Sequence, residues 1–317
     1  MRLRSLRFII AVLLFVGMSV FSNALPASAK TLKSTSSGSV QFLTLPFPAD
    51  TNMNIQQGWY YSSPSPYPAC PIRSNDLRLH CGIDYIDGTI DKSSTWQHFA
   101  VVAAADGEAC AEVASNPRGN CVWGEGNRVL IKHDLGNGVI LYTYYGHLNW
   151  IAPWIPIGNR NNTVHVTQGS QIGTSGDTGT TPGWVHLHFA LTPPDFTWLD
   201  VYGLYTTREH YPDPNGTNGL TSAPNNYWTN NPPSYAPNLS TKLGGVDLQS
   251  YCQSLGYVGV SLDGTTAYDW HCDTQSGNHV GIWMDDACGW QYSKNHTRAL
   301  VNDFYDPGSW KCYVDTF

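Results

Sequence analysis

The chain has 317 residues, of which 41% are hydrophobic and 13% charged, and its formal net charge is −7. This length accommodates two modest domains, and the hydrophobic share suffices for a sizeable core, which excludes wholesale disorder. Few charges and many Gly, Pro, Trp and Tyr residues favour β-strands and structured loops over long charged helices. The negative charge excludes nucleic acid as an expected partner, because such binding depends on Lys and Arg that neutralise phosphates.

The N-terminal segment has the three parts of a secretory signal peptide. Three arginines precede an apolar run over residues 8–21, which is short for a membrane span, and the small residues 27–29 form a cleavage signature. We therefore predict a signal peptide over residues 1–29 and a secreted, extracellular protein. A Ser/Thr-rich leader follows over residues 30–38. No later segment is apolar enough to cross a bilayer, so no membrane association is expected after cleavage.

Residues 39–205 alternate short β-rich runs with turn signals. The runs lie at 101–103, 129–131, 139–143 and 185–189. Spacers rich in Gly, Asn and Asp separate them, as in antiparallel sheets joined by tight turns. We expect a mainly β domain here, without an amphipathic helix.

Two further regions complete the predicted organisation. Residues 206–244 are rich in Pro and Asn and are expected to form a flexible linker. Residues 245–317 contain four cysteines and four tryptophans, which predicts a small disulfide-rich C-terminal domain. Its tryptophans suit either a surface that stacks on saccharides or the filling of a small core.

The eight cysteines all lie beyond the predicted signal peptide. In an oxidising compartment they predict disulfides, and the close spacing favours Cys70 with Cys81 and Cys110 with Cys121. Metal binding by thiolates is the weaker alternative, because the chain contains no C-x-x-C.

Two short segments combine histidine with apolar residues in alternation. His80 and Asp84 are four residues apart, so on an extended strand both would lie on one face, with Gly82 leaving a gap between them. His186 and His188 would likewise share a face, opposite three apolar residues. His147 follows a predicted strand between these two segments.

One carboxylate and several imidazoles are ligands that Zn²⁺ prefers. Each segment alone has an ordinary explanation, since H-x-x-x-D occurs by chance and H-x-H is often a pair of surface imidazoles. Their joint occurrence on turn-bounded strands favours a metal site. The other histidines have no comparable pattern and are expected to be ordinary core or surface residues: His98, His133, His165, His210, His271, His279 and His296.

These motifs resemble the lysostaphin-type (LytM-like) zinc endopeptidases, which cleave peptide cross-links of bacterial cell walls. Residues 80–84 are similar to the family's H-x-G-x-D segment, and residues 142–148 to the strand that ends in Y-x-H-L. Residues 173–179 resemble its G-x-S-G-x-T-G motif, and residues 186–189 its H-L-H-F motif. The likeness covers residues 80–192 in the family's order.

The resemblance implies a zinc metallopeptidase domain with an antiparallel β-sheet over residues 39–205. His80, Asp84 and His188 would hold Zn²⁺, while His147 and His186 would be catalytic and flank the attacking water. The implied partners are bacterial peptidoglycan peptides, and the protein is expected to act as a monomer.

The chain departs from the family at two positions. Ala190 stands where the family commonly has Glu, and Ser74 stands where some members have an oxyanion-binding tyrosine, for which Tyr67 is a candidate substitute. A non-catalytic peptidoglycan-binding protein or hydrolase activator is the alternative function, but all five key positions are filled. A cupin-like metal protein is the third hypothesis, and it is disfavoured because no Glu follows the H-x-H pair.

Overall fold

The structure is a computed structural model that describes residues 40–50, 52–62, 70, 78–113, 126–158, 160–214 and 227–314. Residues 33–317 make up one compact unit. The predicted signal peptide and leader lie outside the described residues, as do Tyr67, Ser74 and Cys121. No helix among the described residues has the length and hydropathy needed to cross a membrane.

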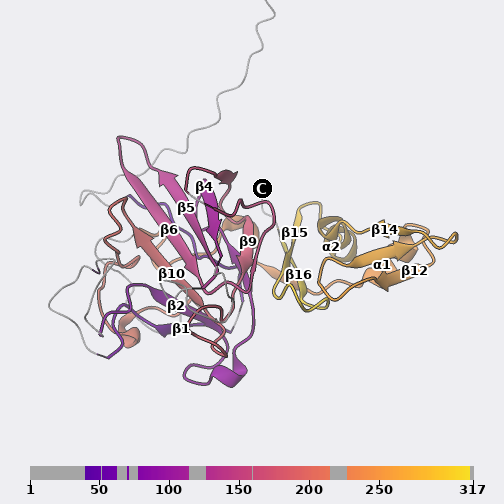
Figure 1. The fold of residues 1–317 in the computed structure, drawn as a ribbon. Coiled ribbons are helices and arrows are strands. Elements are labelled where there is room, and N and C mark those ends of the chain that lie inside the picture. The colour runs from indigo at the N-terminus through magenta and orange to yellow at the C-terminus, as the bar shows by residue number, and fades with distance from the viewer. Residues whose placement is uncertain are drawn as a thin grey trace, which may run out of the picture. The chain divides into compact units, whose positions relative to one another are not determined.

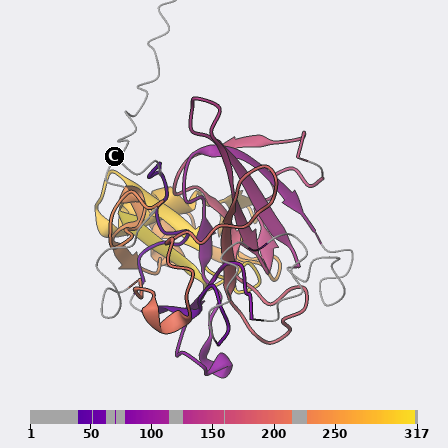
Figure 2. The same cartoon turned by 90° about the vertical axis from the view of Figure 1, so that its left-hand side faces the viewer.

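The main sheet contains seven described strands, and every neighbouring pair in it is antiparallel (Figure 1). The order of the strands across the sheet differs from their order along the chain. From one edge to the other the strands are β1 (Met53–Gln57), β2 (Ile83–Asp87), β10 (Leu187–Thr192), β6 (Ile140–Gly146), β5 (Arg128–Asp134), β4 (Gly107–Glu112) and β8 (Val164–Val166). Figure 2 shows the same sheet after a quarter turn.

A second, smaller sheet packs against the main one. It is formed by β3 (Ala100–Val102), β9 (Gln171–Thr174) and β7 (Trp150–Ile151), in that order. Side chains from both sheets share one hydrophobic core, including Val101, Ile131, Ile172 and Phe189. The mainly β, antiparallel prediction is therefore confirmed, and among the described residues of 40–205 the only helical element is the 3₁₀ turn η1 (Ser93–Thr95).

The alternation predicted for residues 185–189 is present from Leu187 onward, in β10, whereas Val185 and His186 precede the strand and Val185 is only half-buried. Leu187, Phe189 and Leu191 enter the main core, while His188 and Ala190 lie on the opposite face. This strand is central in the main sheet, so both of its faces are buried.

The segment over residues 206–244 is not the free coil that its Pro and Asn content predicts. Its described parts include the 3₁₀ turns η2 (Arg208–His210) and η3 (Pro237–Leu239) and the strand β11 (Lys242–Gly244). Trp228 is fully buried in the main core, and its backbone forms a parallel bridge with Leu43. Composition missed this because a few apolar anchors, here Trp228 and Leu239, are enough to pack a Pro-rich segment.

The C-terminal residues form two three-stranded sheets and two helices. One sheet has the order β11, β16 (Trp310–Val314), β15 (Thr297–Val301), and the other β12 (Gly259–Leu262), β13 (Trp270–Asp273), β14 (His279–Gly281). The helices are α1 (Leu248–Ser254) and α2 (Met284–Tyr292).

Three disulfides join described cysteines. They are Cys70–Cys81, Cys252–Cys272 and Cys288–Cys312. The first confirms the predicted pairing, and the other two fasten α1 to β13 and α2 to β16. Cys110 is buried, and its predicted partner lies outside the described residues.

Candidate metal centre

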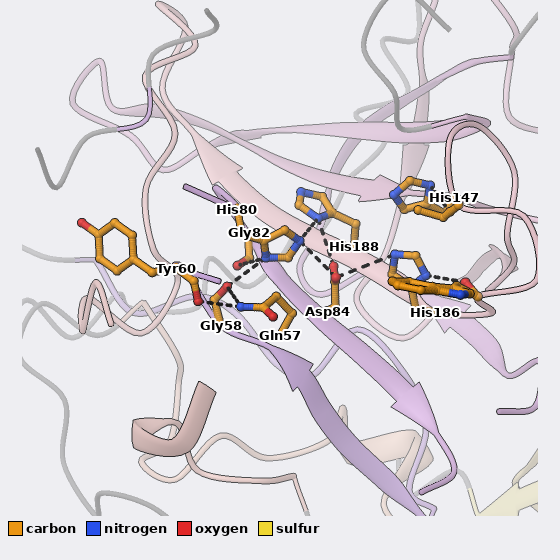
Figure 3. A network of polar contacts seen from close by, with 11 residues as sticks. Gln57, Gly58, Tyr60, His80, Gly82, Asp84, His147, His186 and His188 are labelled. Atoms are coloured by element: carbon orange, nitrogen blue, oxygen red, sulfur yellow. Dashed lines mark hydrogen bonds and ion pairs between the residues drawn. The ribbon is translucent and has the colours of Figure 1, made fainter. Parts of the chain in front are cut away.

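Asp84 and His188 face each other across two neighbouring strands, although 104 residues separate them in sequence. In the antiparallel pair of β2 and β10 they are directly opposite. The other neighbour of β10 is β6, where His188 lies opposite Gly146, so His147 follows at the same end of the sheet. The strand order thus brings three motifs together at one place (Figure 3).

His80 reaches this place from the loop before β2, not from the strand itself. Cys81 has a left-handed backbone with φ of 68°, which turns the chain between His80 and the first strand residue. The shared strand face expected for His80 and Asp84 is therefore wrong, although their side chains still meet. The Cys70–Cys81 disulfide fastens the turn next to His80.

Three side chains converge closely enough to share one metal ion. Nε2 of His80 is 3.0 Å from Oδ2 of Asp84, and Nδ1 of His188 is 3.1 Å from Oδ1 of Asp84. Nδ1 of His188 is also 3.2 Å from Nε2 of His80. One ligand atom from each of the three lies within 4.8 Å of the others.

In three of the four clustered histidines, Nδ1 lies within hydrogen-bond distance of a backbone carbonyl oxygen. The pairs are His80 with Gly58 (2.9 Å), His147 with Thr178 (2.8 Å) and His186 with Trp184 (2.6 Å). A carbonyl oxygen can only accept, so Nδ1 carries the hydrogen and Nε2 of the neutral ring keeps its lone pair. These contacts hold each ring with Nε2 available for a metal or a proton.

His147 and His186 lie side by side next to the three converging residues. Their ring centroids are 4.5 Å apart, and Nε2 of His186 is 3.8 Å from Oδ2 of Asp84. Both rings are buried. The structure therefore brings together all five residues that the sequence singled out.

The electrostatics of the cluster keep Asp84 ionised and two histidines neutral. Burial alone would raise the pKa of Asp84, but attraction to His80 and His186 and hydrogen bonds from His188 and His80 hold it well below its usual range. Burial, together with the neighbouring His186 and His188, lowers the pKa of His147 to about 3. Burial also lowers the pKa of His186.

These residues fit a zinc ion on the chemistry of their donors. Two imidazole nitrogens and one carboxylate oxygen form the ligand set of many catalytic zinc sites, which keep a further position open. The backbone contact at Nδ1 of His80 supplies the outer support that such ligands commonly have.

The cluster lies at the bottom of a cleft of about 560 Å³. Among the described lining residues, aromatic and uncharged polar side chains surround the cluster, and the histidines and the carboxylate are those of the cluster itself. The wall residues are Gln56, Gln57, Tyr61, Trp96, Thr180, Thr181 and Trp184.

Sequence reasoning missed the residues of the cleft wall. Tyr61 contacts the His80 ring, with centroids 5.2 Å apart, and burial together with Asp84 raises the pKa of its phenol to about 12. Thr181 Oγ1 is 3.2 Å from Nδ1 of His147. A tyrosine or threonine in a loop carries no pattern that marks it, so only the fold reveals these contacts.

Ala190 lies on the same face of β10 as His188, buried in a small apolar cluster with Leu130 and Tyr144. A glutamate at this position would be surrounded by apolar side chains, so alanine suits the packing found here. The departure from the family pattern leaves the five clustered side chains in place.

In a comparison with known protein families, residues 79–196 match the model described as Peptidase family M23. A search of curated proteins found no match.

Several solved structures are similar to part or most of the chain. The catalytic domain of the antimicrobial peptidase lysostaphin from Staphylococcus simulans is 22% identical, covering 48% of this chain and 92% of its own, with a TM-score of 0.31. A mutant of the catalytic domain of the prophage-encoded M23 protein EnpA from Enterococcus faecalis is 18% identical, covering 49% and 94%, with a TM-score of 0.31. Lysostaphin itself, the antimicrobial peptidase from Staphylococcus simulans, is 16% identical, covering 85% and 91%, also at 0.31.

Proposed function

This chain contains a Peptidase family M23 domain over residues 79–196, and on that premise we propose that it is a secreted zinc endopeptidase that hydrolyses peptide bonds of bacterial peptidoglycan. The observation that carries the proposal is the convergence of His80, Asp84 and His188 on one point, with two neutral histidines beside them.

His80, Asp84 and His188 would hold the metal through the three atoms that lie within 4.8 Å of one another. A bound Zn²⁺ would supply Lewis acidity and lower the pKa of a water molecule toward neutrality. Asp84 stays in the ionised form that a metal ligand requires, because the surrounding histidines hold its pKa well below its usual range.

His147 and His186 would handle the protons of the reaction. Each donates its Nδ1 hydrogen to a fixed carbonyl, so Nε2 can accept a proton from the attacking water and pass one to the leaving amine. Their low pKa values keep both rings neutral at neutral pH, which is the form that can accept. The same neutral rings add no competing positive charge beside the metal ligands.

The substrate class rests on the cleft and on the family. Trp96 and Trp184 contact each other edge to face, with ring centroids 6.4 Å apart, and would together form one aromatic wall against which an extended peptide chain packs. Secretion follows from the predicted signal peptide over residues 1–29, since peptidoglycan lies outside the membrane.

The direct test is incubation of the purified mature protein with defined peptidoglycan fragments, with the products read by mass spectrometry. Hydrolysis would yield paired products that together gain one water, and the new termini would identify the cleaved bond. Binding of the fragments without products, by a protein that holds stoichiometric zinc, would instead support a non-catalytic wall-binding role.

The C-terminal residues 245–317 would hold the enzyme on the wall. Trp283 is 79% exposed, and Trp290 is also exposed. Each of these two tryptophans therefore has indole surface accessible for stacking on saccharide rings. A wall-binding surface on the same chain raises the local concentration of substrate without adding contacts in the cleft.

A further inference from the structure

The exposed face of the sheet β12–β13–β14 carries an unusual set of side chains. In β13, Cys272 is buried and bonded to Cys252, so the neighbouring His271 and Asp273 point to the other face. In β14, His279 pairs directly with Asp273 and therefore shares that face. Asp263 follows the end of β12 at the same side of the sheet.

The carboxylate of Asp263 lies between the two imidazoles. Its Oδ2 accepts a hydrogen bond from Nδ1 of His279 and is 3.2 Å from Nδ1 of His271. The two rings are nearly parallel, with centroids 5.8 Å apart. One nitrogen from each histidine and one oxygen of Asp263 lie within 4.8 Å of one another.

One buried ring nitrogen in this group has no hydrogen-bond partner among the described residues. Nδ1 of His271 is buried, yet it forms no hydrogen bond with any residue in the described part of the chain, because it is not aligned with the nearby Asp263. A buried polar atom without a partner costs about 1–3 kcal/mol, so such atoms commonly mark a missing ligand or ion. This nitrogen is 3.2 Å from Oδ2 of Asp263, within the group whose candidate ligand atoms lie within 4.8 Å of one another.

A fourth polar side chain, that of Asp273, lies next to His279 on the side of the ring away from Asp263. Oδ1 of Asp273 is 3.6 Å from Nε2 of His279, the ring nitrogen that faces away from Asp263. The same Oδ1 accepts a hydrogen bond of 2.7 Å from Ser261, which fixes its position. With a metal on Nδ1 of His279, the ring hydrogen would instead be on Nε2, and a small shift from 3.6 Å would let it donate to Asp273. Zinc-ligating histidines commonly have such a carboxylate partner, which orients the ring and makes the ligand nitrogen more basic.

We propose that Asp263, His271 and His279 bind a second divalent metal ion, with zinc as the expected occupant and Asp273 as the positioning residue for His279. Two imidazole nitrogens and a carboxylate oxygen favour zinc over magnesium or calcium, which prefer oxygen ligands alone. The site is separate from the peptidase cluster and does not depend on the proposed activity.

The bound ion would link three segments of this small sheet. Asp263 lies between β12 and β13, His271 within β13, and His279 at the start of β14. The disulfide from Cys272 already fastens the opposite face to α1. A metal on the exposed face would therefore add a second fastening to a part of the chain with few buried apolar residues.

Zinc content of the full-length mature protein tests the proposal. The chain is stripped with a chelator, dialysed against micromolar zinc, and measured by mass spectrometry of the metal together with titration calorimetry. We expect His279→Gln to hold one zinc fewer than the wild type. In a His188→Ala background, which removes the peptidase ligand, one zinc should remain and should be lost on adding His279→Gln.

His296→Gln is the matched control, because His296 is exposed in the same part of the chain and belongs to neither candidate metal group of the described residues. It should retain the wild-type zinc content. Asp263→Asn should lose the same equivalent as His279→Gln, and circular dichroism of the metal-free variants should match the wild type.

Equal zinc content in the wild type and His279→Gln would overturn the proposal, as would binding that occurs only at millimolar zinc. The His188→Ala background separates this result from the peptidase function. A chain without peptidase activity can still gain or lose the second ion.

Discussion

Gly82 lies against the ring of His188: a Cβ added at Gly82 would be 2.5 Å from both Nε2 and Cε1 of that ring. The gap expected between His80 and Asp84 is therefore occupied by the third proposed ligand. This explains in physical terms why the segment from His80 to Asp84 requires glycine at its centre.

Gly82→Ala should displace His188 and weaken zinc binding by about 10- to 100-fold, the effect typical of disturbing the support of a metal ligand. Peptidase activity should fall with it. Gly245→Ala is the control, because the nearest atom to its added Cβ is 3.9 Å away. Titration calorimetry with zinc measures the effect, and wild-type affinity in Gly82→Ala would contradict the contact.

Asp84→Asn preserves the shape of the side chain but removes the charge that joins the two histidine ligands. The variant should hold one zinc fewer than the wild type, and turnover should fall by more than about 10³-fold, because the metal contributes several kcal/mol to such reactions. The exposed Asp134→Asn should leave both unchanged. Zinc analysis and a peptidoglycan digest on the same samples test this, and a zinc content of Asp84→Asn equal to that of the wild type would exclude Asp84 as a ligand.

His147→Ala should retain zinc but lower turnover by about 10²- to 10⁴-fold, the range for removal of a general acid or base. His147 is not one of the three residues whose ligand atoms converge on the metal position, so its loss should affect turnover without affecting zinc binding. The exposed His165→Ala serves as the matched control. A rate near that of the wild type would rule out proton transfer through His147.

The stability of the protein should depend on pH through His133, far from the metal cluster. Its ring is buried, with Nδ1 bonded to the Asp106 carbonyl and Nε2 to Thr143, and burial lowers its pKa from 6.5 to about 4. Between these values the unfolded chain binds more protons, so stability falls as the pH drops below 6.5 and the loss is complete below 4. At pH 5 the loss should be about 2 kcal/mol relative to neutral pH.

Thermal unfolding of the wild type and His133→Gln between pH 5 and 7.5 measures this contribution. The variant should lose that part of the pH dependence, whereas His165→Gln should keep it. Identical pH profiles for all three proteins would show that His133 does not titrate as its burial requires.

Trp283→Ala should weaken binding to intact cell walls and leave hydrolysis of small soluble peptides unchanged, because Trp283 is exposed outside the catalytic cleft. Leu255→Ala removes another exposed apolar side chain and should have no effect. Sedimentation with purified walls, alongside a soluble-peptide assay, makes the comparison. Unchanged sedimentation of Trp283→Ala would count against a wall-binding role for this residue.

The resemblance to lysostaphin-type peptidases is confirmed, and the residues that support it were visible in the sequence because each motif is local. Alternation in residues 185–189 predicts that Leu187 and Phe189 enter the core, and β10 has that arrangement for both. The Cys70–Cys81 pairing was also predictable, since only ten residues separate the two cysteines.

The pairing of His271 with His279 had no such local signal. These two histidines are eight residues apart, and no local pattern distinguishes them from ordinary core or surface histidines. They meet because a hairpin places β14 next to β13, with Asp263 brought in from the end of β12. Residue spacing alone cannot reveal a cluster that depends on the register of two hairpins.

Local patterns in the sequence determined the runs that become β3, β5, β6 and β10, the likeness to the peptidase family and the five residues of the candidate centre, because alternation and motif spacing are properties of neighbouring residues. The tertiary structure alone decided that β2 and β10 are adjacent, that Cys81 turns the chain so that His80 meets Asp84, and that Trp228 anchors a Pro-rich segment in the core. The reason is that strand order and packing arise from contacts between residues far apart in the chain, which the sequence does not encode at any single position.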